Sequence, residues 1–269
     1  MPLQLGKDGL AKRVFARATL INMRATATRL ENFYATRLGQ AARDMAARRL
    51  HTVWPDLSGK NVLGFGYGWP YLQPYEATAN RVVLAMPDEQ GAIAQPGKRG
   101  VATLLCDEQA LPFSDASFDN ILAIHAIEDA SSAKVLMAEL YRVCRPEGRI
   151  VVIAANRSGI WSRAESLPFG SGRPFSRRQL RQVLSQVGFQ PTLSSNALYI
   201  PPIKRLAKPK VSMAVERFGE TVWPGFSGLV LVEAIKRLYA TPDNGQAQKV
   251  ARPVFGGAPV MNRTNRDHV

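Results

Sequence analysis

Hydrophobic and polar residues follow two different periodic patterns along the middle of the chain. Short apolar runs typical of buried strands alternate with segments whose apolar residues recur every three or four positions, as on one face of a helix. The strand-like runs are NVLGF (61–65), RVVLAM (81–86), VATLLCD (101–107), FDNILAIHAI (118–127) and RIVVIAAN (149–156). Because continuous apolar strands that alternate with helices form parallel sheets covered on both faces, we predict a doubly wound α/β fold.

The helical pattern of apolar residues begins before the first predicted strand. Residues 31–57 are rich in Ala, Leu and Arg and predict one helix, which Pro55 ends. Between the first two strands, residues 70–79 favour a second helix, and Pro74 makes it short or kinked.

Later segments carry clearer signals of where helices start and stop. SSAKVLMAELYRVC predicts a helix with Ser131 or Ser132 as its N-cap, and SRRQLRQVLSQVGF predicts one between Ser176 and Gly188. TLSSNALYI and SGLVLVEAIKR are two candidate final strands. The predicted organisation is a basic extension at 1–30, a helix at 31–57, one α/β domain at 58–240 and a Pro/Gly-rich disordered tail at 241–269.

Composition places the chain among ordinary soluble proteins. Hydrophobic residues make up 46% and charged residues 21%, and no apolar run approaches the roughly 20 residues that span a bilayer. Cys106 and Cys144 stand in apolar contexts, which favours buried free thiols in a reducing compartment, so we expect a cytoplasmic protein. His51, His125 and His268 lack the spacing of zinc ligands, and we predict no metal site.

The net charge of +14 is concentrated toward the two ends. Residues 1–53 hold ten lysines and arginines against Asp8, Glu31 and Asp44. Basic ends bind nucleic acid, anionic lipid or an acidic protein, or simply keep a protein soluble. The first thirty residues fit a transit peptide, a basic amphipathic helix that makes peripheral contact with a membrane or a partner, or an early start codon.

The third predicted strand and the segment after it carry the most specific motifs. Asp107 ends the strand, and L-P-F at 111–113, D-x-S-F-D at 115–119 and R-V-x-R-P-x-G at 142–148 follow in order. This pattern resembles the class I S-adenosylmethionine (SAM)-dependent methyltransferases, particularly their small-molecule branch. Together with a G-x-G turn after the first strand, the resemblance covers residues 58 to about 190.

The resemblance implies a Rossmann-like, mostly parallel seven-stranded sheet with helices on both faces, SAM as cofactor and a small-molecule methyl acceptor. Ligands of doubly wound sheets bind beyond the carboxyl ends of the strands. In the family, the residue that matches Asp107 commonly accepts a hydrogen bond from the adenine amino group. The cofactor-binding residues implied here are Gly64, Gly66, Tyr67, Gly68, Met86, Asp107 and Glu108.

Two positions depart from the family pattern. Gly64 stands where the family has an acid that helps to hold the amino end of the cofactor, and Met86 stands where an acid takes both ribose hydroxyls. Each hydrogen bond to a charged group contributes about 1.5–3 kcal/mol, so losing two weakens binding by roughly 10² to 10⁴. Asp88 and Glu89 substitute for Met86 if the strand end bends at Pro87.

His125, at the end of the fourth strand, is the candidate catalytic base, since methyl transfer needs at most one. A histidine packed at a strand end is the alternative interpretation. Glu128 and Asp129 follow it and either line the same rim or cap the next helix.

Three functions compete. The first is a SAM-dependent methyltransferase with an unknown, small-molecule acceptor. The second is a catalytically inactive, methyltransferase-like protein that serves a protein partner in binding or regulation, which the changes at Gly64 and Met86 favour. The third is a nucleic-acid methyltransferase; only the charge favours it, and no RNA-binding module accompanies it.

Five aromatic side chains would either shape an acceptor pocket or fill the core. They are Phe169, Phe175, Tyr199, Trp223 and Phe226.

Overall fold

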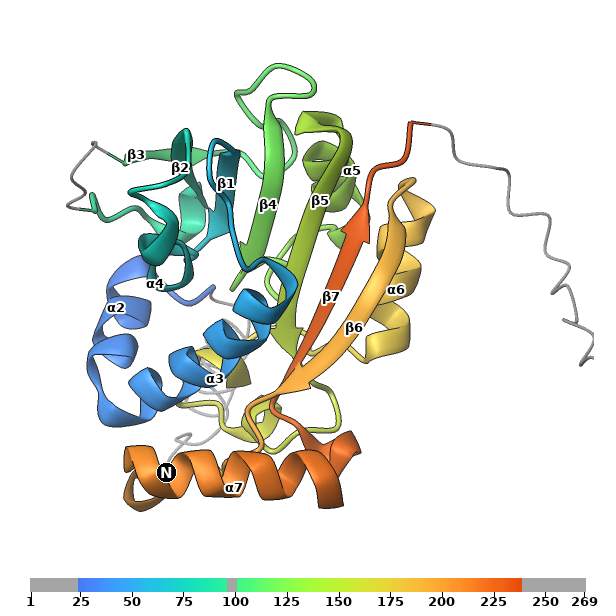
Figure 1. The fold of residues 1–269 in the computed structure, drawn as a ribbon. Coiled ribbons are helices and arrows are strands. Elements are labelled where there is room, and N and C mark those ends of the chain that lie inside the picture. The colour runs from blue at the N-terminus through green and yellow to red at the C-terminus, as the bar shows by residue number, and fades with distance from the viewer. Residues whose placement is uncertain (1–23, 96–100, 239–269) are drawn as a thin grey trace, which may run out of the picture. The chain divides into compact units, whose positions relative to one another are not determined.

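The alternating pattern builds one seven-stranded sheet with the strand order β3-β2-β1-β4-β5-β7-β6 (Figure 1). The strands are β1 (Asn61–Gly66), β2 (Arg81–Pro87), β3 (Ala102–Cys106), β4 (Phe118–Ile124), β5 (Cys144–Ala155), β6 (Gln190–Ala197) and β7 (Leu229–Ile235). Strands β1 to β5 pair in parallel, and β7 lies antiparallel between β5 and β6. The predicted Rossmann-like, mostly parallel fold is confirmed.

The computed structural model describes residues 24–95 and 101–238. Residues 1–23 of the predicted transit-like or amphipathic segment and the whole predicted disordered tail lie outside the described residues. Among the helices that are described, none has both the length and the apolar character needed to cross a membrane.

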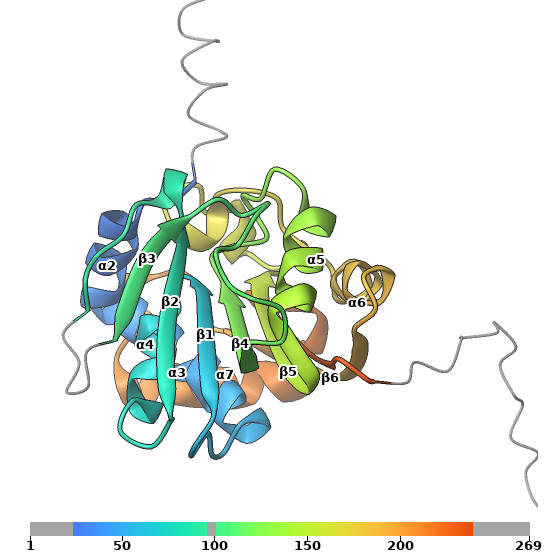
Figure 2. The same ribbon diagram turned by 90° about the horizontal axis from the view of Figure 1, so that it is seen from above.

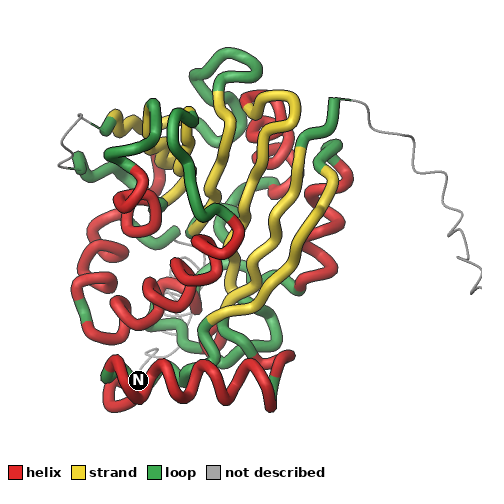
Figure 3. Tube along the Cα trace, in the orientation of Figure 1, coloured by secondary structure: helices red, strands yellow, loops and turns green. Residues whose placement is uncertain are grey.

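Helices cover both faces of the sheet (Figures 2 and 3). They are α2 (Ala27–Ala35), α3 (Arg37–Val53), α4 (Trp69–Leu72), α5 (Ala133–Val143), α6 (Arg177–Gln186) and α7 (Pro209–Val222). Successive residues of a strand point to opposite faces, so Val62 joins the core under α2, α3 and α4, while Leu63 joins the core under α5 and α6. This double burial explains why the strands read as continuous apolar runs.

The N-terminal helix predicted for 31–57 is instead two helices. Thr36 has an extended backbone with ψ 156° and caps α3, because its hydroxyl accepts a hydrogen bond from the Gly39 N–H. The first of the two helices begins at Ala27, inside the segment predicted as an extension, and buries Leu30 completely. Packing against the sheet thus begins earlier in the chain than the helical pattern indicated.

Other boundaries also differ from prediction. Strand β4 stops at Ile124, because His125 adopts a left-handed backbone with φ 51°. Strand β5 takes in the predicted RPEG turn and begins at Cys144. Helix α6 has the predicted Ser176 cap, as part of a capping box, and Gly188 follows it with φ 103°. Helix α7 was not predicted at all.

Candidate functional site

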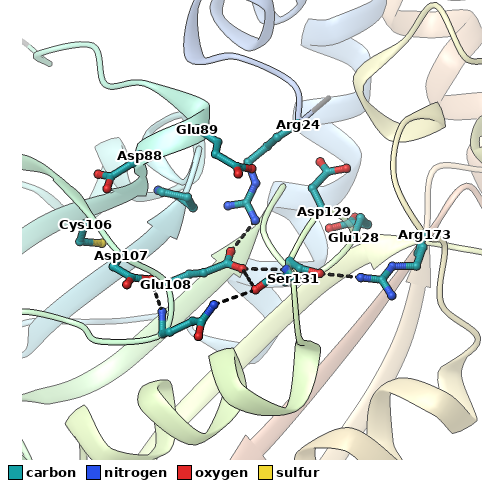
Figure 4. A pocket seen from close by; sticks show the side chains of 13 residues that line it. Arg24, Asp88, Glu89, Cys106, Asp107, Glu108, Glu128, Asp129, Ser131 and Arg173 are labelled. Atoms are coloured by element: carbon teal, nitrogen blue, oxygen red, sulfur yellow. Dashed lines mark hydrogen bonds and ion pairs between the residues drawn. The ribbon is translucent and has the colours of Figure 1, made fainter. Parts of the chain in front are cut away.

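A cavity of about 630 Å³ lies beyond the carboxyl ends of β2, β3 and β4 (Figure 4). This is the edge where doubly wound sheets bind ligands, beside the β1/β4 switch in strand order. We call it the acidic cavity. Its lining residues are Arg24, Pro87, Asp88, Glu89, Cys106, Asp107, Glu108, Gln109, Glu128, Asp129, Ala130, Ser131 and Arg173.

The lining contains six carboxylates and two guanidinium groups. The chain as a whole carries a net charge of +14, so the acidic cavity has the opposite sign to the rest of the protein. A concave site lined by one sign of charge concentrates ligands of the other sign. The acidic cavity therefore favours a cationic ligand.

Arg24 enters the acidic cavity from the segment before α2. Figure 4 shows its guanidinium between Glu89 and Asp129, directed toward Glu108. Arg24 and Glu108 form an ion pair, and Glu108 also accepts hydrogen bonds from the Ser131 N–H at 2.7 Å and from the Ser131 hydroxyl at 2.8 Å. The Arg24 side chain is buried, yet its Nε and Nη1 atoms have no partner among the described residues.

Glu128 is a second buried charged group on this wall. Its Oε1 accepts a hydrogen bond of 2.9 Å from the Ala155 N–H at the end of β5, whereas Oε2 finds no partner within the described part of the chain. Burial raises the pKa of Glu128 to about 7. Burial also raises the pKa of neighbouring Asp129. Unpartnered buried polar atoms are costly, so a ligand that pairs with them gains affinity.

The remaining carboxylates are more exposed. Asp107 accepts a hydrogen bond of 2.8 Å from the Gln109 N–H, so it caps a turn and lines the acidic cavity at once. Asp88 and Glu89 are exposed and make no ion pair or side-chain hydrogen bond to the described residues. Both are available to a ligand. Cys106 is a free, buried thiol whose pKa burial raises to about 12, so it stays protonated.

The glycine loop after β1 lies against β4 rather than facing the acidic cavity. Gly66 has φ 80°, and a Cβ there would lie 2.2 Å from the Ile124 carbonyl oxygen. The Tyr67 N–H donates to that same oxygen at 3.2 Å. A Cβ at Gly64 would lie 2.8 Å from Leu72 and 2.9 Å from Leu84. An acid at position 64 would have to displace both leucine side chains, which is the physical reason for glycine there.

Aromatic side chains fill the space beside this loop. Phe33, Tyr34, Tyr67, Tyr71, His125 and Phe169, all buried, form what we call the aromatic cluster. The Tyr34 hydroxyl hydrogen-bonds His125 Nε2 at 2.7 Å and the Tyr71 hydroxyl at 2.9 Å. The His125 ring stacks on Phe169 with ring centroids 4.5 Å apart. Burial lowers the pKa of His125 to about 3, so its imidazole is neutral.

Gln90 closes the cluster from the side of β2. Its side chain is buried, and Nε2 donates a hydrogen bond of 3.0 Å to the His125 carbonyl oxygen. Met86 is also buried, and its carbonyl oxygen accepts from the Cys106 thiol at 3.8 Å. The predicted ribose position is therefore occupied by a core side chain.

The structure brings some of the predicted site residues together and leaves others apart. Asp107 and Glu108 line the acidic cavity, together with the substitutes Asp88 and Glu89. The predicted residues outside its lining are Gly64, Gly66, Tyr67, Gly68, Met86 and His125. Sequence reasoning missed Arg24, for which no local signal exists.

Among the five aromatics considered for an acceptor pocket, Phe169 belongs to the core, whereas Trp223 and Phe226 are exposed. In the described residues, no group of three or more His, Cys, Asp or Glu side chains is arranged to hold a metal ion.

Comparison with known proteins places this geometry in context. Residues 62–152 match the family described as "Methyltransferase domain". A malonyl-[acyl-carrier protein] O-methyltransferase of Erwinia billingiae is 36% identical over 96 residues, which are 35% of this chain and 38% of that relative. The ubiquinone/menaquinone biosynthesis C-methyltransferase UbiE of Burkholderia multivorans is 32% identical over 65 residues, 23% of this chain and 26% of its own length. The chain thus spans well under half the length of these relatives.

A crystal structure of a SAM-dependent methyltransferase from Thermotoga maritima has the same fold, with a TM-score of 0.57 and 18% identity. The alignment covers 77% of this chain and 94% of that one.

Proposed function

We propose that this chain, a member of the class I SAM-dependent methyltransferases, binds SAM in the acidic cavity and methylates a small-molecule acceptor. The observation that carries the proposal is the acidic cavity itself, which lies at the ligand-binding edge of the sheet and has six carboxylates in its lining. When bound, SAM supplies a methyl group on a positively charged sulfonium. A site of this sign attracts that cation before any contact is made.

The residues present fit SAM in size and in chemistry. A volume of about 630 Å³ lies within the roughly 300–1,000 Å³ of small-molecule sites. The carboxylates of Asp88 and Glu89 would accept the ribose hydroxyls, and Asp107 would accept the adenine amino group. The unpartnered Nε and Nη1 atoms of Arg24 would pair with the carboxylate of the amino-acid end.

Glu128 is also the better-placed proton acceptor. A pKa of about 7 suits a general base near neutral pH, and Glu128 faces the acidic cavity. The base role predicted for His125 remains a prediction, and it would require the contact with Tyr34 to open.

A small acceptor suits the site better than a nucleic acid does. Phosphates are attracted by lysine and arginine, whereas carboxylates dominate the acidic cavity. The two relatives carry the names of a malonyl-[acyl-carrier protein] O-methyltransferase and a quinone-biosynthesis C-methyltransferase. These names support an acyl or quinone-like acceptor class.

Calorimetric titration of the full chain with SAM and with S-adenosylhomocysteine tests the proposal. We expect saturable binding of both, and tighter binding of SAM at low salt, because only SAM carries the sulfonium charge. Asp107→Asn should weaken SAM binding roughly tenfold, since it removes one charge-assisted hydrogen bond. Asp44→Asn, an exposed change on α3 outside the lining, is the matched control. No heat with either ligand would refute the proposal.

The aromatic cluster supports a second candidate function, that of an inactive methyltransferase-like protein with a protein partner. Tyr67, His125 and Gln90 close the space beside the glycine loop, where the resemblance places part of the cofactor. This candidate predicts that neither SAM nor its demethylated product raises the melting temperature, even at millimolar concentration. A shift with either ligand argues against it.

A further inference from the structure

A patch of apolar side chains lies exposed around α7 and the short turn after it. Phe218, Val222, Trp223 and Phe226 are between 45% and 63% exposed. The rings of Phe218 and Trp223 touch edge to face, with centroids 5.8 Å apart. We call these four residues the α7 patch. Clustered exposed apolar groups of this kind mark interaction sites rather than ordinary surface.

The orientation of α7 is fixed by contacts on its inner face. Glu216 is fully buried, and its two oxygens accept hydrogen bonds from the Leu198 N–H at 2.8 Å and the Tyr199 N–H at 2.6 Å. Glu220 forms ion pairs with Arg48, at 2.5 Å, and with Arg49. Because these polar anchors face inward, the α7 patch must face outward.

Exposed basic residues accompany the α7 patch along the same segment of the chain. Arg205, Lys208 and Arg217 are exposed. The acids within residues 203–228 are Glu216, which is buried, and Glu220, which two arginines neutralise. This segment of the chain therefore combines exposed aromatic and aliphatic groups with an excess of exposed basic residues.

We propose that the α7 patch docks on the surface of an anionic lipid bilayer. Aromatic rings settle at the level of the headgroups, aliphatic side chains enter the upper hydrocarbon region, and lysine and arginine pair with lipid phosphates. A nucleic acid would leave Val222 without an apolar partner. Positive charge on the same segment as exposed aromatic and aliphatic groups matches the chemistry of an anionic bilayer surface.

Docking would bring the ligand-binding edge of the sheet to the membrane. Helix α7 lies across the carboxyl edge of the sheet, at the bottom of Figure 1. The segment after α7 is tied to that edge, because Asn156 Nδ2, just beyond β5, donates to the Ser227 carbonyl oxygen at 2.8 Å. The proposal rests on this surface and does not depend on methyl transfer.

Tryptophan fluorescence of the full chain provides a direct test. Of the four tryptophans, Trp54, Trp69 and Trp161 are buried, and Trp223 is 58% exposed. With phosphatidylglycerol–phosphatidylcholine vesicles, we expect the emission to shift to the blue and the protein to sediment with the lipid. Pure phosphatidylcholine should produce much less of both, and added salt should weaken binding to the anionic vesicles.

Paired variants identify the surface responsible. Trp223→Ser with Phe226→Ser should weaken vesicle binding by about tenfold or more, with an unchanged melting temperature. Leu105→Ser with Leu193→Ser removes comparable exposed apolar groups on β3 and β6, and should leave binding unchanged. Lys208→Gln with Arg217→Gln should weaken binding to the anionic vesicles alone.

Three results would overturn the proposal. One is a Trp223→Ser, Phe226→Ser variant that binds vesicles like the wild type, since the basic chain ends would then be responsible. The second is a blue shift that follows protein concentration without lipid, which would indicate a second copy of this chain on the α7 patch. The third is tight binding of single-stranded nucleic acid with no response to vesicles.

Discussion

The acidic cavity and the aromatic cluster are neighbours at one edge of the sheet, yet they differ in openness, charge and hydrogen bonding. The cavity is open and lined by charged groups, and buried atoms of Arg24 and Glu128 in it have no partner among the described residues. The cluster is closed, and its polar atoms, such as the Tyr34 hydroxyl, bond to one another. Polar atoms of the first region remain for a ligand, whereas Tyr34 in the second hydrogen-bonds both Tyr71 and His125.

This difference explains the two departures from the family pattern. Position 64 has leucines on either side, and Met86 is packed in the core. An ionised acid at either position would be buried in an apolar setting, at a cost of several kcal/mol. The carboxylates that remain for a ligand lie in the segments that follow the carboxyl ends of β2, β3 and β4.

The largest expected effect comes from removing one buried ring from the aromatic cluster. Phe169 is 1% exposed and packs on His125, Phe33 and Trp161. We expect Phe169→Ala to lower the free energy of unfolding by about 3–5 kcal/mol, measured by urea denaturation. Phe226→Ala, at a site 63% exposed, should change it by no more than about 0.5 kcal/mol. Equal losses would contradict the contrast between a closed core and an open surface.

Next in size is the pH dependence that Glu128 imposes. Its pKa rises from 4.5 in the unfolded chain to about 7 in the folded protein, so the folded state keeps a proton that the unfolded chain has lost. The free energy of unfolding should therefore fall by about 3 kcal/mol as the pH rises from about 4.5 to about 7. Glu128→Gln should lack this fall, while Asp129, Arg24 and Arg173 remain in place. Parallel stability curves for the two proteins would show that Glu128 does not titrate as described.

A smaller effect should follow from removing one hydroxyl in the cluster. Tyr34→Phe leaves His125 Nε2 and the Tyr71 hydroxyl each without a partner, and should cost about 1–3 kcal/mol of unfolding free energy. Tyr141→Phe is the control, because its hydroxyl has no hydrogen bond to the described residues. SAM affinity should be the same in both variants. If Tyr34→Phe alone strongly lowered the affinity for SAM, the aromatic cluster and the acidic cavity would act as one binding site, contrary to their separation.

Much of the sheet could be predicted because its strands are buried on both faces and are therefore apolar throughout. The ends of helices and strands were harder to predict, because they depend on single residues. The Thr36 side chain caps the start of a second helix, and the left-handed backbone at His125 ends a strand. Helix α7 was missed because its outward face carries Phe218 and Val222 while its inward face carries Glu216, the reverse of the usual amphipathic pattern.

Only part of the site could be predicted, for a different reason. Asp107 belongs to a local motif, so its position after a strand could be predicted from the sequence. Arg24 pairs with Glu108, 84 residues away, and no short pattern encodes that contact. The sequence left Glu128 as either a rim residue or a helix cap, and its raised pKa depends on burial that only the folded chain creates.

The place of β7 in the sheet bears on how the protein is made. This strand is the last along the described chain, yet it lies between β5 and β6. During synthesis, β5 keeps an unpaired edge and β6 has no neighbour until residues 229–235 leave the ribosome. Unpaired strand edges invite association with other chains, so the nascent protein is most vulnerable just before its final strand emerges, and a message cut short at that point yields a chain that cannot complete its sheet.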